Sequence, residues 1–131
     1  MDWNEAKAKI EKTIVVGTDL NTSDSTYRKV LKTNHICESK RYNYNGEKGF
    51  RVQIGKNKNN DAVCIPWSML ERCFLELKKR GVFNIKVFRE YYPDQCKDHP
   101  CHVHVVGMIF VKAGIATLND NGKEKNYLLL K

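Results

Sequence analysis

The densest group of side chains that could do chemistry lies in residues 96–104, which read Cys-Lys-Asp-His-Pro-Cys-His-Val-His. Thiolates and imidazoles are the ligands that zinc prefers, and three or four of these side chains could converge on one ion. The candidate zinc ligands are Cys96, His99, Cys101 and His104. Their spacing matches no standard zinc finger, and histidines exposed beside DNA would explain the cluster without metal. We therefore expect no cofactor and keep zinc as the alternative.

Other catalytic signatures are mostly absent. The chain has no GxSxG, HExxH, P-loop or GxGxxG motif. Cys101 precedes His102, but adjacent residues rarely face each other as a nucleophile and its base must. A Pro-Asp pair at 93–94 resembles the first half of a metal-dependent nuclease motif, although no Glu-x-Lys tripeptide follows it. A loop site for Mg²⁺ could use Glu90, Asp94 and Asp98. We expect no catalytic residues, and a small metal-dependent nuclease is the one enzymatic alternative.

The charge distribution favours a polyanionic partner. The chain of 131 residues has 23 Lys and Arg against 15 Asp and Glu, a net charge of +8. Residues 28–58 hold nine basic and two acidic side chains, a net +7, whereas residues 1–27 hold three lysines and five acids, a net −2. Each phosphate that a protein neutralises releases condensed counterions, so a basic stretch promotes binding to nucleic acid. A solvated basic surface is the alternative.

The basic stretch supplies most of the candidate nucleic-acid contacts. Six side chains are expected to contact phosphates, which position a protein without reading sequence: Lys40, Arg41, Lys48, Arg51, Lys56 and Lys58. Tyr42 and Tyr44 lie two residues apart and would share one face of a strand. They could stack on bases or pack across strands.

The first half of the chain predicts one helix followed by strands. Asp2 can cap a helix over 3–14, and 18–26 is a polar loop. Residues 25–33 form a short helix or an extended piece that ends at Asn34. Alternating apolar residues at 50, 52 and 54, a turn over 56–61 and a strand over 62–65 predict a hairpin within 42–65. Gly46 and Gly49 suggest a tight connection before that first strand.

The second half predicts three helices and a hairpin. Pro66 opens a helix over 67–80 that Gly81 ends, and a shorter helix covers 84–92. Residues 100–113 favour a helix, with a buried strand over 101–118 as the alternative. A hairpin joins 115–118 to 127–130. The expected core residues are Trp67, Leu70, Phe74, Leu77 and Phe88.

This order of elements is typical of a winged helix-turn-helix. Its third helix would lie in the major groove, and its hairpin would touch the DNA backbone. His102 and Lys112 are then the candidates for the groove, and Lys123 and Lys125 for the wing.

We therefore expect a small single α+β domain over 1–131, with helices and two β-hairpins. Its basic hairpin region covers 40–65, and its helical, winged-helix-like region covers 66–131. The expected function is non-catalytic binding of nucleic acid, with double-stranded DNA favoured and the choice between DNA and RNA left open, as in modules of phages, mobile elements or restriction and defence systems. The alternative is an inhibitor or adaptor that docks on an acidic protein surface. The absence of a secretory signal at Met1–Glu5, the lack of a long apolar run and five cysteines predict a reduced, cytoplasmic protein without a membrane partner.

Overall fold

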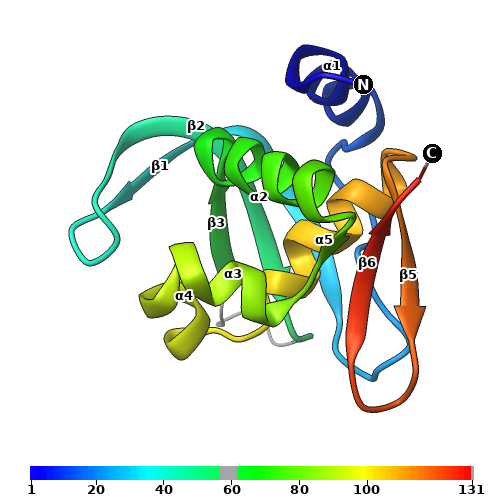
Figure 1. The fold of residues 1–131 in the computed structure, drawn as a ribbon. Helices are drawn as coiled ribbons and strands as arrows, with labels where there is room; N and C mark the ends of the chain where they lie inside the picture. Colours follow the sequence, from blue (N-terminus) through cyan, green and yellow to red (C-terminus); the bar gives the residue numbers. More distant parts are fainter. Residues whose placement is uncertain (57–61, 131) are drawn as a thin grey trace.

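Helices and two antiparallel sheets make up the α+β fold of the chain (Figure 1). The structure is a computed structural model that describes residues 1–56 and 62–130. The helices are α1 (Trp3–Thr13), α2 (Trp67–Arg80), α3 (Ile85–Tyr91), α4 (Pro93–Asp98) and α5 (His102–Lys112). The strands are β1 (Arg28–Ser39), β2 (Tyr44–Ile54), β3 (Ala62–Pro66), β4 (Val82–Phe83), β5 (Ala116–Asp120) and β6 (Lys125–Leu129).

The first sheet has the strand order β1-β2-β3, with every pair antiparallel. Val30 pairs with Val52, which also pairs with Val63, and all three side chains are buried. Gly49 pairs with Pro66, and a Cβ atom at Gly49 would lie 2.1 Å from the carbonyl oxygen of Ile65. Only glycine therefore permits this close approach of β3 to β2.

The core lies between the first sheet and the helices. Phe74 of α2 packs edge-to-face on Phe110 of α5, with 6.4 Å between ring centroids. All but three residues of α5 are buried, because the helix is apolar on nearly every side. Within α5, Gly107 faces the ring of Tyr127, to which a Cβ atom would approach within 2.4 Å.

The second sheet has the order β4-β6-β5 and closes the C-terminal half. Val82 pairs with Leu128, and Ala116 pairs with Leu129 on the other side of β6. The loop between β5 and β6 projects from the body at the lower end of Figure 1. Tyr127 on β6 is fully buried and ties this sheet to α5.

Most of the elements expected from sequence are confirmed. The first helix ends at Thr13, and the Asp2 carboxylate accepts a hydrogen bond from Glu5 N, as a cap should. The helix over 67–80 has the predicted bounds, and 102–112 is a helix, so the strand alternative for 101–118 is wrong. The hairpins near 50–65 and 116–129 are also present. The predicted turn at 56–61 lies, apart from Lys56, outside the described residues.

Three sequence expectations near the first hairpin and α3 are corrected. Asn34 does not end an element: it adopts a left-handed φ of 50° at an irregularity inside β1, which continues to Ser39. Gly46 and Gly49 lie within β2, and the tight connection is at 40–43 instead. Pro93 ends α3 but also begins α4, because proline suits a first helical turn. The two-residue strand β4 was not predicted, because no pattern in the sequence indicates it.

Candidate nucleic-acid interface

The β1–β2 hairpin projects from the body of the domain (Figure 1). Its pairing register places lysines on both of its faces. Lys32 on β1 pairs with Arg51 on β2, and Lys48 on β2 pairs with the exposed Ile36. Residues directly opposite in an antiparallel pair share a face, and successive residues alternate. Residues 48 and 51 are three positions apart on β2, so Lys48 and Arg51 face opposite sides of the hairpin. Lys32 shares the face of its partner Arg51, and it therefore lies on the face opposite Lys48.

Four lysines of this segment are exposed and free of acidic neighbours. Within residues 1–56 and 62–130, none of them has a carboxylate oxygen within 4.0 Å: Lys32, Lys40, Lys48 and Lys56. Lys58, also predicted as a phosphate contact, lies outside the described residues. Lys32 was not among the predicted contacts, because the sequence did not show that 25–33 belongs to a strand. The exposed basic surface therefore extends further along β1 than expected.

The turn of the hairpin is anchored to α4. The Arg41 guanidinium donates to Asp98, with 2.9 Å between Nη2 and Oδ1, and the Tyr42 hydroxyl donates to the same carboxylate. These bonds, that from Arg41 foremost, hold the pKa of Asp98 well below its usual range. Arg41 is thus the charged partner of an acid, whereas Lys40, the other basic side chain in the turn, is exposed and has no ion pair with any described residue.

The two tyrosines of the hairpin pack together. The ring centroids of Tyr42 and Tyr44 are 5.5 Å apart, and the Tyr44 hydroxyl accepts a hydrogen bond from Gln95. Burial raises the pKa of Tyr44 to about 12. Both rings also line a groove of about 300 Å³ that α3 and α4 close with Tyr91 and Tyr92. Tyr44 therefore packs on α4, and both tyrosine rings border the groove.

The first basic side chain of β1, that of Arg28, is not on the surface. Arg28 is 1% exposed, and its Nη2 lies 3.2 Å from Asp24 Oδ2. Burial is the largest single effect and would raise the pKa of Asp24, but the hydrogen bonds from Arg28 and Thr26 N and the charges of Arg28 and Lys125 together outweigh it and lower that pKa to about 2. Lys125 Nζ lies 3.5 Å from the same carboxylate. Arg28 and Lys125 are consequently held in ion pairs with Asp24 and add little positive charge to the surface.

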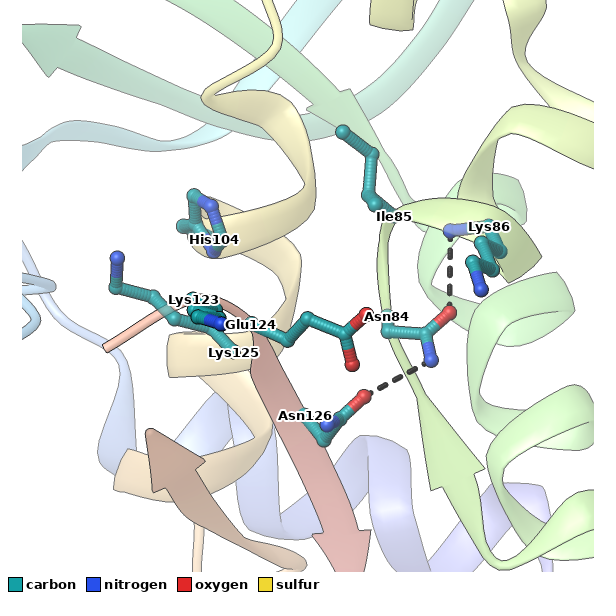
Figure 2. A pocket seen from close by; sticks show the side chains of 8 residues that line it. All are labelled: Asn84, Ile85, Lys86, His104, Lys123, Glu124, Lys125 and Asn126. Atoms are coloured by element: carbon teal, nitrogen blue, oxygen red, sulfur yellow. Dashed lines mark hydrogen bonds between the residues drawn. The ribbon is translucent and has the colours of Figure 1, made fainter. Parts of the chain in front are cut away.

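The predicted wing residues border a second cavity, of about 200 Å³ (Figure 2). Lys123 and Lys125 come from the β5–β6 loop and β6, and His104 points toward them from α5. His104 Nδ1 lies 3.0 Å from the hydroxyl of the buried Tyr127, and burial lowers the pKa of His104 to about 4. The imidazole is therefore neutral near pH 7, and the lysines alone supply positive charge here.

The residues predicted for the major groove are not brought together. His102 is 2% exposed, its Nδ1 lies 2.9 Å from the carbonyl oxygen of His99, and its ring stacks on Phe88. Burial lowers the pKa of His102 to about 4, so it is a neutral core residue. Lys112 is exposed at the other end of α5. Because α5 is buried along most of its length, it does not present a face that a groove can receive.

The candidate metal residues are scattered. Cys96 is buried, Cys101 Sγ lies 4.0 Å from Arg28 Nη2, and His104 bonds Tyr127. Glu90 pairs with Arg80. Among the described residues, no three His, Cys, Asp or Glu side chains are grouped closely enough to hold a metal ion.

Comparison with known proteins gives no match to a family model, a curated protein or a solved structure. Within the described ranges, no helix combines the length and the apolar character that crossing a membrane requires.

Proposed function

We propose that the protein is a non-catalytic module that binds double-stranded DNA through the β1–β2 hairpin. The observation that carries this proposal is the set of exposed lysines on both faces of a projecting two-stranded ribbon, none of which has a carboxylate within 4.0 Å among the described residues. The major groove of B-form DNA admits a two-stranded ribbon, and both walls of the groove carry phosphates. A ribbon with lysines on both faces suits that position.

The hairpin lysines contact phosphates in this arrangement, and the anchoring of the turn keeps the ribbon rigid. Tying Arg41 and Tyr42 to Asp98 fixes the turn against α4 before binding. Pre-ordering of this kind reduces the conformational entropy that binding must otherwise remove. The β5–β6 loop lies on the other side of the domain in Figure 1, so Lys123 is not part of the hairpin's footprint.

The proposal differs from the winged-helix mode that the element order suggested. That mode needs an exposed third helix, whereas α5 is enclosed by the core cluster. The hairpin carries the charge and the exposure that the helix lacks.

Fluorescence anisotropy with labelled duplex DNA, single-stranded DNA and duplex RNA tests the proposal. We expect tighter binding to duplex DNA than to either other probe, because the deep major groove of A-form RNA excludes a ribbon. The logarithm of the affinity should fall linearly with the logarithm of salt concentration. Absence of binding to all three probes at about 50 mM salt would reject nucleic acid as the partner and favour an acidic protein surface.

A further inference from the structure

The cavity of about 200 Å³ shown in Figure 2 is lined mainly by polar side chains from three parts of the fold. Asn84 and Lys86 come from the start of α3, His104 comes from the first turn of α5, and the remaining polar side chains come from the β5–β6 hairpin. The kind of ligand that the cavity suits depends on which of these side chains have free N–H groups and which have free acceptors.

The backbone of α3 fixes the orientation of two asparagine side chains. Asn84 Oδ1 caps the helix: it accepts hydrogen bonds from the backbone nitrogens of Lys86, at 3.1 Å, and Val87, at 3.2 Å. A backbone N–H group can only donate, so the amide nitrogen of Asn84 must face the other way, where it donates to Asn126 Oδ1 at 2.9 Å. The amide nitrogen of Asn126 is then left with N–H groups that no described residue accepts.

A buried tyrosine fixes the position of the proton on His104. Tyr127 is 0% exposed, and its hydroxyl lies 3.0 Å from His104 Nδ1, its one hydrogen-bond partner among residues 1–56 and 62–130. A buried hydroxyl whose proton had no acceptor would destabilise the fold, so the hydroxyl donates to Nδ1 and the ring carries its own proton on Nε2. Burial lowers the pKa of His104 to about 4, so the ring is neutral near pH 7. His104 thus offers one N–H group to the cavity that it lines.

The charged side chains of the cavity add further donors. Lys86 and Lys123 are exposed and form no ion pair with a described acid, whereas Lys125 lies 3.5 Å from Asp24. Glu124 is the one carboxylate in the lining, and Figure 2 shows it pointing toward the two asparagines. The lining therefore has three lysines to one carboxylate, and its oriented neutral side chains present N–H groups. This excess of donors suits a ligand that is rich in acceptors and negatively charged.

We propose that this cavity binds the phosphate group of a small molecule. The oxygens of a phosphate accept hydrogen bonds from His104 Nε2, from Asn126 Nδ2 and from the lysine ammonium groups, and bonds of this charge-assisted kind are the strong ones. The neutral donors are already oriented by Tyr127 and Asn84, so binding does not have to order them. Cavities that hold drug-sized ligands measure about 300–1,000 Å³. This smaller one therefore fits inorganic phosphate or a compact phosphomonoester.

Glu124 gives the proposal a signature that a general attraction to positive charge would lack. Its carboxylate repels a bound phosphate, so Glu124→Gln should tighten phosphate binding by about two- to fivefold. Lys123→Gln should weaken binding by a similar factor, since it removes one exposed cation. Both residues lie in the exposed β5–β6 loop, so neither substitution disturbs the core.

Titration of the isotope-labelled full chain with inorganic phosphate, followed by nuclear magnetic resonance at constant ionic strength, tests the proposal. We expect saturable shifts at the imidazole of His104, the side-chain amide of Asn126 and the backbone of the β5–β6 loop. Asn126→Asp replaces a donor by an acceptor and should weaken binding by about tenfold or more. Lys112→Gln is the matched control: it removes an exposed lysine at the far end of α5 and should bind phosphate like the parent.

Three results would overturn the proposal: shifts that do not saturate, an effect of Lys112→Gln equal to that of Lys123→Gln, or weaker binding in Glu124→Gln. A second titration with duplex DNA identifies the source of the phosphate. If DNA shifts the signals of His104 and Asn126 and inorganic phosphate does not, the cavity contacts the DNA backbone and the proposal of a small-molecule site is wrong. The β5–β6 loop lies away from the β1–β2 hairpin in Figure 1, so shifts in the hairpin report DNA binding separately. The phosphate site and the DNA interface can therefore fail independently.

Discussion

Replacing Lys32 and Lys48 by glutamine removes one cation from each face of the hairpin and leaves the fold unchanged. Both side chains are exposed and make no ion pair with any described residue, so their loss should alter the free energy of unfolding by less than about 0.5 kcal/mol. Their loss should weaken DNA binding strongly, because each removes a phosphate contact. The pair therefore separates binding from stability.

The magnitude follows from the four lysines without acidic neighbours. Four phosphate contacts give a log–log salt slope of about −3.6, so affinity falls ~150-fold between about 50 and 200 mM salt. Two contacts give a slope of about −1.8 and a fall of ~12-fold over the same range. At about 100 mM salt, the double variant should bind ~60-fold more weakly than the parent.

Anisotropy titrations at several salt concentrations measure both quantities. Lys78→Gln with Lys79→Gln is the matched control, because these exposed lysines at the end of α2 carry the same charge on the side of the domain away from the hairpin turn (Figure 1). The control should keep the parent's slope. If both pairs reduce the slope equally, binding reflects net charge and the hairpin is not the footprint. If Lys32→Gln alone acts and Lys48→Gln is silent, the ribbon lies flat on DNA and does not enter the groove.

Three further predictions concern the interior. Gly107→Ala should destabilise the protein by about 1–3 kcal/mol in urea denaturation, because its methyl group would overlap the Tyr127 ring; a gain in stability would mean that helix propensity outweighs this contact. Asp24→Asn should cost about 2 kcal/mol by leaving Arg28 buried without its anion, and Arg28→Met in the same background should recover part of that loss. The pKa values of His102 and His104 in α5 are lowered to about 4, so unfolding below the ordinary histidine pKa of 6.5 takes up protons. The stability that each neutral imidazole contributes is therefore complete above pH 6.5 and is lost as the pH falls toward 4. The free energy of unfolding should fall by up to ~1.4 kcal/mol per pH unit for each histidine. His102→Gln should make the stability profile between pH 4.5 and 6.5 less steep, and an unchanged steepness would contradict the neutral buried state.

Elements with strong local signals were predictable from the sequence. The helix over 67–80 has a proline at its start, an apolar stripe and a glycine with a φ of 79° at its end, and each of these signals is local. β1 lacks such signals. Its burial alternates only in part, because irregularities near Asn34 and between Cys37 and Glu38 change which side chains face inward. A strand with interrupted alternation does not show the period of two on which sequence prediction depends.

The sequence shows where the positive charge of the candidate site is concentrated, but it does not show which of the basic side chains are exposed. The sequence shows a basic segment, yet it could not distinguish Lys48, which is exposed, from Arg28, which is buried against Asp24. It also placed His102 in a groove, whereas the Phe88 ring covers it. The ion pair between Arg41 and Asp98 left no trace in the sequence, because it joins residues 57 positions apart in the chain. Long-range contacts of this kind have no spacing that a sequence can show.

Arginines and lysines occupy different environments in the basic segment, and this difference affects how the protein would bind DNA. Two of the three arginines of residues 28–58 are paired with acids, Arg28 with Asp24 and Arg41 with Asp98, and Arg51 is the half-buried register partner of Cys64. The exposed cations of this segment that have no acidic partner among the described residues are lysines, which act on phosphates as point charges. Guanine is read most often by the forked guanidinium of arginine. The hairpin therefore offers strong electrostatic attraction with little means of reading bases, which favours binding that depends on groove shape and salt more than on sequence.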